Sequence, residues 1–390
     1  MDTSATPLSQ FIIKSASRCN LNCSYCYVYN KGDLTWRARP AIMSDETFKM
    51  TIARIRRHCL FSGQRSVILT FHGGEPCLIA PGRFDSWCNW IAEQLADIVT
   101  VQISIQTNGT LLNPSWIDVL SRHNVDVGVS MDGPKNLHDV FRVDHKGRGS
   151  YDAVERGLML LRDSGIRFGI LSVVQLGADP LIIHHHFLGL GCKYICYLLP
   201  AYTHDTIGPI RERYGPHPCA DFLLPIFDDW WFNSTLDVRI REFWTIARLI
   251  MGGTTDLDSF GNPPIRFVSV ETDGEIHGLD KLRICEDGYT RLGLNVYDGD
   301  FRDFTQTNAL HAHVLAGMLL PQACNPCPER DTCAGGYLPH RYSRAHGFDN
   351  PSVWCADLLA IFTHIRERLG VSVEDTRRRR EALAARQPVE

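Results

Sequence analysis

Short apolar runs rich in β-branched residues alternate with helix-like stretches over the first half of this chain. Six runs have the length and composition of buried strands: residues 11–16, 66–73, 101–108, 125–133, 167–175 and 193–201. Among the intervening helices, one over 44–59 has Ser44 as its cap, and one over 150–165 begins at Ser150 and ends at Gly165. Strands that alternate with helices pair in parallel beneath a helical cover. Because a closed barrel needs eight such units, the pattern predicts a partial (β/α)6 barrel of the TIM type, open along one side.

The alternation of strands and helices ends near residue 202, which predicts further domains in the second half. The predicted divisions are a barrel over 1–202, a helical bridging segment over 203–262, a small cysteine-rich domain over 263–370 and a charged tail over 371–390. Helices are expected at 221–234, 238–253 and 357–370, and a hairpin at 265–279. Within the hairpin, Asp273-Gly274 is a dipeptide that favours a tight turn. The chain is therefore expected to be an α/β protein with a smaller second domain.

Charge and hydropathy exclude two classes of partner. The 40 basic and 44 acidic residues give a formal net charge of −4, without the basic excess of a nucleic-acid-binding protein. No window holds the roughly 18 consecutive apolar residues of a membrane span, and residues 1–10 lack the pattern of a signal peptide. The expected location is the cytoplasm, where the 14 cysteines stay reduced. Clustered cysteines in that compartment are metal ligands or catalytic groups.

Half of the cysteines fall in two tight groups. The first group is Cys19, Cys23 and Cys26, and the second is Cys324, Cys327, Cys333 and Cys355. The other seven are expected to be mostly small, buried hydrophobic residues: Cys59, Cys77, Cys88, Cys192, Cys196, Cys219 and Cys285. Three thiolates can hold three irons of a four-iron cluster and leave the fourth iron open to a ligand that is not protein. For the first group, the alternatives are simple packing and a zinc site, which normally has four protein ligands.

Polar, glycine-rich segments follow the second, third and fourth predicted strands. They are "FHGGEP" at 71–76, "QTNG" at 106–109 and "VSMDGP" at 129–134. Glycines allow the backbone to approach a ligand closely, although they also form simple turns between strand and helix. Because strand ends at the mouth of a barrel gather small-molecule groups, we expect these segments to converge beside the first cysteine group.

"CNLNCSYC" at 19–26, together with "GGEP" at 73–76, resembles the signature of radical S-adenosylmethionine (SAM) enzymes of the SPASM group, and the resemblance covers nearly the whole chain. It implies that Cys19, Cys23 and Cys26 hold a catalytic 4Fe–4S cluster whose open iron chelates SAM. The implied SAM contacts are Tyr25 near the adenine, Gly73, Gly74 and Glu75 at the amine, Ser130 and Arg142 at the carboxylate or ribose, and Asn108 at the third strand end. In that chemistry a 5′-deoxyadenosyl radical removes a hydrogen atom from an unactivated carbon.

The second cysteine group makes a closed site of four thiolates, which zinc and an iron–sulfur cluster fit equally well. By the resemblance, Cys324, Cys327, Cys333 and Cys355 are the ligands of one auxiliary 4Fe–4S cluster. Related proteins carry a further, inner cluster, but Tyr337 stands at one expected cysteine, and Leu279 and Asp280 stand near another. Cys285 is left as an unassigned candidate. The sequence therefore predicts one auxiliary cluster and no inner one.

"GGYLPHRYS" and "GFDNPSVWCADLL" resemble maturases of ribosomally made peptides that join an aromatic ring to a side-chain β-carbon in a cyclophane. The expected activity is such a crosslink, with Asp280 as proton acceptor or, alternatively, as a surface carboxylate in a turn. Other radical SAM outcomes stay open: epimerisation, thioether formation, and formylglycine formation, which the missing inner cluster disfavours. From another class, a zinc-binding module without enzymatic activity is the remaining alternative.

The expected partners are a ribosomal precursor peptide and an electron donor such as flavodoxin or ferredoxin. Few residues precede the first predicted strand, so no leader-binding domain is expected there, and a separate leader-binding protein is a further candidate partner. Neither nucleic acid nor a membrane is among the expected partners.

Overall fold

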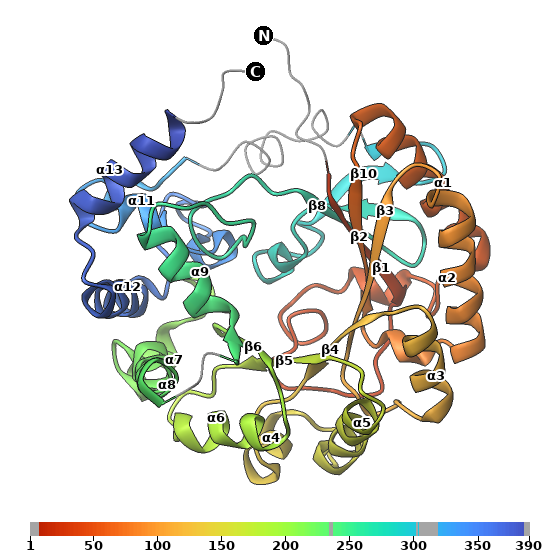
Figure 1. The fold of residues 1–390 in the computed structure, drawn as a ribbon, viewed down its shortest axis with the longest axis horizontal. Helices are drawn as coiled ribbons and strands as arrows, with labels where there is room; N and C mark the ends of the chain where they lie inside the picture. Colours follow the sequence, from red (N-terminus) through yellow and green to blue (C-terminus); the bar gives the residue numbers. More distant parts are fainter. Residues whose placement is uncertain (1–7, 234–236, 302, 304–318, 386–390) are drawn as a thin grey trace. The chain divides into compact units, whose positions relative to one another are not determined.

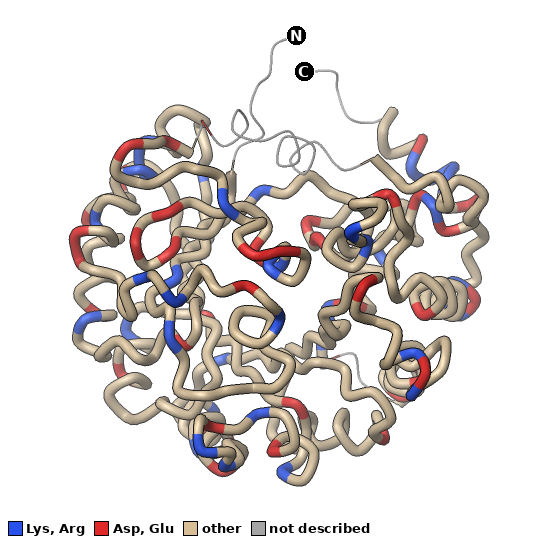
Figure 2. The backbone as a smooth tube through the Cα atoms, turned by 180° about the vertical axis from the view of Figure 1, so that it is seen from behind, with Lys and Arg blue, Asp and Glu red and all other residues tan. Residues whose placement is uncertain are grey.

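The computed structural model describes residues 8–233, 237–301, 303 and 319–385, so the outer ends of the predicted barrel and tail lie outside the described residues. The described chain forms two compact units that interleave along the sequence. Unit 1 comprises the described parts of 1–171, 186–192 and 266–315, and unit 2 those of 172–185, 193–265 and 316–390. Basic and acidic residues are interspersed along the backbone (Figure 2). Among the described helices, none is both long and apolar enough to cross a membrane.

A mostly parallel sheet organises unit 1, in the strand order β10-β9-β8-β1-β2-β3-β4-β5 (Figure 1). Its strands are β1 (Gln10–Ala16), β2 (Ser66–Gly73), β3 (Thr100–Thr107), β4 (Asp126–Ser130), β5 (Phe168–Val173), β8 (Phe267–Val270), β9 (Glu275–His277) and β10 (Arg291–Asn295). β1 to β4 each pair in parallel with the next strand, and β8 pairs in parallel with the other side of β1. The predicted hairpin is β8 and β9, which turn at Gly274 with a φ of +86°. The predicted α/β class with a mostly parallel sheet is confirmed.

Helices connect the parallel strands of unit 1 and lie along one side of them (Figure 1). They are α1 (Asp45–Ser62), α2 (Pro81–Leu95), α3 (Pro114–Arg122), α4 (Lys135–Phe141) and α5 (Tyr151–Asp163), with the short 3-10 helices η1 (Thr35–Ala38), η2 (Pro76–Leu78) and η3 (Asp280–Ile284). α1 begins as predicted, because the Ser44 side chain accepts a hydrogen bond from the Thr47 N–H at 3.0 Å. The expectation that Ser150 caps α5 is wrong, since its hydroxyl donates to the Arg142 carbonyl at 2.7 Å instead.

The core of unit 1 lies between these helices and the sheet. Phe48 of α1 stacks on Trp87 of α2 with 4.2 Å between ring centroids, and Phe71 of β2 meets Phe84 of α2 edge to face at 4.8 Å. All four side chains are buried. Aromatic rings bury large apolar areas and pack with defined geometry, so this core fixes the strands from whose ends the polar segments emerge.

The second half of the chain supplies most of the remaining elements. They are α6 (Pro180–Gly189), β6 (Tyr194–Leu198), α7 (Gly208–Tyr214), α8 (Pro218–Asn233), β7 (Arg239–Ile240), α9 (Arg241–Ile250), η5 (Gln322–Cys324), α11 (Arg330–Cys333), η6 (Leu338–Arg341), α12 (Cys355–Leu369) and α13 (Val373–Ala384). β6 is the sixth predicted strand and pairs in parallel with β7. The stretch predicted as one helix over 238–253 begins as the two-residue strand β7 and continues as α9.

One buried interaction between helices and one exposed capping box stabilise the helices of unit 2. The Asp357 carboxylate of α12 accepts hydrogen bonds from the Cys219 and Ala220 N–H groups of α8, at 2.7 and 2.9 Å. In the charged tail, Ser372 and Asp375 form a capping box at the start of α13. The helices predicted at 221–234 and 357–370 are therefore present as α8 and α12, while the predicted domain boundaries stay predictions.

Candidate active site

The first cysteine group lies on the loop that follows β1. Cys19, Cys23 and Cys26 are each half-buried, and the Cys26 N–H donates to the Cys23 carbonyl at 3.0 Å. The loop is fastened to the segment after β4, because the Asn22 N–H donates to the Val143 carbonyl at 2.7 Å. Burial, followed by the nearby Glu75 charge and by the Cys23 and Cys26 thiols, raises the pKa of the Cys19 thiol to about 12. The three thiols therefore share one site.

The "GGEP" segment runs alongside the backbone that enters this loop. The Gly74 N–H donates to the Ala16 carbonyl at 2.8 Å, and the Glu75 N–H donates to the Arg18 carbonyl at 3.0 Å. Gly73 has a φ of +128°, and a Cβ added there would overlap the Ala16 carbonyl oxygen. A Cβ at Gly74 would overlap both the Tyr29 hydroxyl and the Arg18 carbonyl oxygen. Both glycines are thus required by close contact with the chain's own backbone, in addition to any approach by a ligand.

Changing Gly74 to alanine is expected to destabilise the protein by roughly 3 kcal/mol or more. The added Cβ would overlap backbone atoms of Arg18, which cannot move aside as the end of a flexible side chain could. Thermal unfolding of the purified full chain measures the effect. Gly82→Ala is the matched control, since a Cβ at Gly82, in the first turn of α2, meets nothing within 4 Å. Equal melting temperatures for the two variants would contradict the packing role of Gly74.

Glu75 ties the ends of β2 and β3 together and is fully buried. Its carboxylate accepts hydrogen bonds from the Cys77 N–H at 2.9 Å, the Thr107 hydroxyl at 2.6 Å and the Asn108 N–H at 2.7 Å. Burial raises the pKa of Glu75, and these three donors oppose the rise. The Asn108 side chain in turn donates to the Asn20 side-chain oxygen at 2.8 Å and lies 3.7 Å from the Cys19 sulfur. Glu75 and Asn108 therefore connect the ends of β2 and β3 to the cysteine loop.

A buried charge pair stands between the cysteine loop and the end of β4. Arg142 donates to the Tyr25 hydroxyl at 2.6 Å, and its guanidinium lies 3.9 Å from the Asp132 carboxylate, to which Tyr25 also donates. Burial raises the pKa of Tyr25 well above its usual value. The Nε of Arg142 is buried without a hydrogen-bond partner among the described residues. Ser130 accepts a hydrogen bond from the Gln106 amide at 3.0 Å.

Sequence reasoning assigned no role to Asp132, although "VSMDGP" contains it. Its carboxylate is fully buried, and it carries the charge that partners Arg142. An acidic residue directly after a strand end, in a segment already expected to face the site, was the signal that could have identified it.

Asp280 lies at the start of η3, and it is buried, so its alternative interpretation as a surface carboxylate is wrong. Its carboxylate accepts hydrogen bonds from Lys14 at 2.6 Å, from Arg283 at 2.8 Å and from the Tyr27 hydroxyl at 2.6 Å. Burial by itself raises the pKa of Asp280, but Lys14 and Arg283 outweigh it and hold that pKa well below its usual range. The carboxylate is therefore charged and fully engaged, and its role as a proton acceptor stays a prediction.

Arg283 extends this pair into a buried network of charges in unit 1. Besides Asp280, its guanidinium contacts Asp33 and Glu271. Arg39 also reaches Glu271, at 3.4 Å. Leu279, which stands near an expected cysteine of the inner cluster, is buried immediately before the network. Ion pairs and apolar packing thus occupy the segment in which further cluster ligands were expected and were missing.

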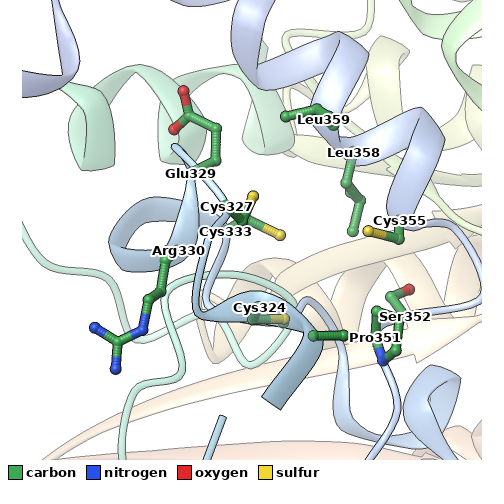
Figure 3. Close-up of a pocket in the computed structure, with 12 residues that line it drawn as sticks. Cys324, Cys327, Glu329, Arg330, Cys333, Pro351, Ser352, Cys355, Leu358 and Leu359 are labelled. Atoms are coloured by element: carbon green, nitrogen blue, oxygen red, sulfur yellow. The ribbon is translucent and has the colours of Figure 1, made fainter. Parts of the chain in front are cut away.

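The second cysteine group surrounds a cavity of about 90 Å³ in unit 2. Cys324, Cys327, Cys333 and Cys355 all line it, and Figure 3 shows Cys355 across the space from Cys327 and Cys333. Within the described residues, no three His, Cys, Asp or Glu side chains converge closely enough for a single metal ion. Four thiols that line one cavity are a candidate ligand set for a metal ion or a metal cluster.

The remaining cysteines have the expected character. Six of them, Cys59, Cys77, Cys88, Cys192, Cys219 and Cys285, are buried, and Cys196 is half-buried. Their thiols belong mainly to the packed interior, as the sequence predicted.

Comparisons with known proteins indicate the family of this chain. The radical SAM superfamily profile matches residues 13–180. A serine-type anaerobic sulfatase-maturating enzyme of Klebsiella aerogenes is 33% identical, over 83% of this chain and 77% of its own length. A cysteine-type anaerobic sulfatase-maturating enzyme of Clostridium perfringens (strain 13 / Type A) is 27% identical, over 93% of this chain and 97% of its own.

A solved structure, native anSMEcpe with bound AdoMet and Kp18Cys peptide, superimposes with a TM-score of 0.79 at 25% identity. The match covers 92% of this chain and 97% of that one. These relatives confirm the expected radical SAM enzyme that modifies a peptide, but they give no support to the finer expectation of cyclophane formation. The chain belongs to the radical SAM superfamily, among the peptide-modifying enzymes related to the anaerobic sulfatase-maturating enzymes.

Proposed function

We propose that this chain holds a 4Fe–4S cluster through Cys19, Cys23 and Cys26 and binds SAM beside it. The donor set supports the proposal, because three thiols share one partly buried loop and soft thiolates are the preferred ligands of iron–sulfur clusters. The same observation disfavours the zinc module, since a structural zinc ion normally takes four protein ligands. When bound, the cluster and SAM together supply a radical that removes a hydrogen atom from the substrate.

The surroundings of the loop support SAM contacts by this chain's own residues. Arg142 has an unsatisfied, buried Nε donor, which suits the carboxylate or ribose oxygens of SAM. Tyr25 and Asp132 fix the orientation of that guanidinium. The buried Glu75 carboxylate accepts from the Cys77 and Asn108 N–H groups, so we infer that it fixes the turn that carries Gly73 and Gly74 and does not itself touch SAM. Preorganised donors of this kind avoid reorganisation when a ligand binds.

We further propose that Cys324, Cys327, Cys333 and Cys355 hold one auxiliary 4Fe–4S cluster. Support comes from the cavity that the four cysteines line, because thiolates are the preferred protein ligands of such clusters. An electron donor such as flavodoxin or ferredoxin and a separate leader-binding protein stay predictions.

The product proposed first is formylglycine, made by oxidation of a serine or cysteine side chain in a protein or peptide. The observation that supports it is similarity to sulfatase-maturating enzymes over 93% of the chain. In the oxidation of serine, the radical would take a hydrogen atom from the β-carbon, a base would take the hydroxyl proton and an iron–sulfur cluster would accept the remaining electron, which leaves an aldehyde at the β-carbon. From cysteine, the same losses would leave a thioaldehyde, which water would hydrolyse to the aldehyde with release of hydrogen sulfide.

The second candidate product is the cyclophane crosslink. It begins with the same loss of a hydrogen atom from a β-carbon, but the radical then joins an aromatic ring. The observation that favours it is the departure from the pattern with two auxiliary clusters, because Tyr337 and Leu279 stand where cysteines were expected. The Tyr337 ring instead contacts His340, with 5.3 Å between ring centroids.

Aldehyde trapping separates the two products. Serine oxidation and crosslinking each remove two hydrogens, so the mass of the intact product does not distinguish them. The reconstituted full chain, SAM and dithionite are incubated with the Kp18Cys peptide and with its serine variant, and an aldehyde-reactive hydroxylamine is then added. We expect a hydroxylamine adduct on the target residue, and no adduct with enzyme in which Cys19 is replaced by alanine. Turnover of SAM with no aldehyde, and a crosslinked fragment pattern in a peptide encoded beside this gene, would favour the cyclophane.

A further inference from the structure

Arg341, the last residue of η6, is a buried arginine that no carboxylate neutralises directly. Its side chain is 2% exposed. Among the described residues, its guanidinium donates to backbone carbonyls alone, to Phe348 at 3.0 and 2.8 Å and to Leu319 at 2.8 Å. Among the ion pairs of the described residues, none includes Arg341. Burying a charge is costly unless an opposite charge lies nearby, so this guanidinium requires an anion.

The second cysteine group provides the nearest candidates. Cys324 interacts with Arg341 electrostatically and raises the pKa of the guanidinium, against the larger lowering caused by burial. A Cβ at Gly335, two residues after Cys333, would lie 3.7 Å from a terminal nitrogen of Arg341. Asp349 also acts on Arg341, but it is exposed to solvent, which screens its charge. The buried positive charge therefore lies beside the cysteine site.

A second buried arginine of unit 2 shows the contrast. Arg366 makes a two-pronged ion pair with Glu329, at 2.7 and 2.8 Å, and Glu329 lines the same cavity. That pair is neutral as a whole, so it contributes little net charge to the cavity. Arg341, in contrast, lies buried beside the cysteines, and no carboxylate of the described residues forms an ion pair with it.

We propose that Arg341 is the counter-ion of the auxiliary cluster and raises its reduction potential. This inference rests on the proposed auxiliary cluster at Cys324, Cys327, Cys333 and Cys355. Four thiolates give the cluster a net negative charge, and one-electron reduction adds a further negative charge to it. A fixed cation in a buried setting stabilises the reduced form more than the oxidised form.

The test compares Arg341→Gln with Arg344→Gln in the anaerobically reconstituted full chain. Glutamine keeps a donor for the Phe348 carbonyl and removes the charge. Arg344 is the matched control, because it lies three residues further along and is exposed. In a redox titration followed by electron paramagnetic resonance, we expect Arg341→Gln to lower the equilibrium constant for reduction of the auxiliary cluster about tenfold, or about 59 mV for one electron. The reduction potential of the other cluster should stay unchanged in Arg341→Gln, and both potentials should stay unchanged in Arg344→Gln.

Iron content separates the failure of this inference from failure of the cluster assignment. About eight irons in every protein with an unchanged auxiliary potential in Arg341→Gln would overturn the role of Arg341. About four irons in the unsubstituted protein would overturn the auxiliary cluster, and the inference with it. If the Arg341→Gln protein does not retain the cluster, the Arg341→Lys variant tests whether a positive charge is required at this position. Retention of the cluster by lysine supports a requirement for charge, and its loss contradicts one.

Discussion

Simultaneous replacement of Cys19, Cys23 and Cys26 by alanine is expected to abolish the reductive cleavage of SAM to 5′-deoxyadenosine. These three thiols share the loop after β1, and no other cysteine lies on that loop. Without thiolates there is no cluster to deliver the electron. Chromatographic measurement of 5′-deoxyadenosine under dithionite, in anaerobically reconstituted protein, should fall to the background of the reaction without enzyme.

Cys196→Ala is the control for this experiment, because Cys196 is half-buried like the three cysteines and belongs to neither group. It should keep SAM cleavage near that of the unsubstituted protein. Continued production of 5′-deoxyadenosine by the triple variant would show that the cluster ligands are assigned wrongly.

Replacement of Cys324, Cys327 and Cys333 by alanine is expected to halve the iron content, from about eight to about four per chain. Removal of three of the four thiols that line the cavity leaves only Cys355 there, and one thiolate does not hold a cubane cluster. Peptide modification should be lost. Some SAM cleavage should remain, because Cys19, Cys23 and Cys26 belong to the other compact unit. Iron is measured colorimetrically, and the modified peptide and 5′-deoxyadenosine are measured by mass spectrometry.

The same measurement tests the missing inner cluster. About twelve irons in the unsubstituted protein would require a third cluster. Such a cluster would have to use Cys285 and other buried thiols as ligands, because Tyr337 stands where one of the usual cysteine ligands is expected. An iron content that stays near eight in the variant would contradict the assignment of the auxiliary ligands.

The six main strands could be predicted because each has a β-branched apolar run whose pattern follows from burial alone. β7 could not, since two residues carry no periodicity, and the segment that follows is a strong amphipathic helix. Ser150 shows a different limit. Its residue type suits a cap, but its hydroxyl is taken by the Arg142 carbonyl, which only the folded chain brings near.

The candidate site divides in the same way. Cysteine spacing and "GGEP" are local in sequence, so the chemistry proposed for the loop after β1 follows from two short stretches of residues. The contacts of Asp280 are not local, because Lys14 lies on the first strand and reaches a carboxylate far along the chain. No pattern near Asp280 announces that partner. The position of Asp280 after a turn suggested that its carboxylate is exposed, but the carboxylate is buried in an ion pair with Lys14.

The parallel pairing of β1 with β8 has a consequence for how the protein is made. Gln10 pairs with Phe267, so β1 leaves the ribosome long before the strand that completes one of its sides. At roughly 5–20 residues per second, synthesis of the roughly 250 intervening residues takes about 10–50 seconds. During that interval one edge of β1 carries unpaired N–H and carbonyl groups, which are a template for pairing with other nascent chains. Chaperones that shield this early edge should therefore increase the yield of folded protein more than substitutions that stabilise the finished sheet.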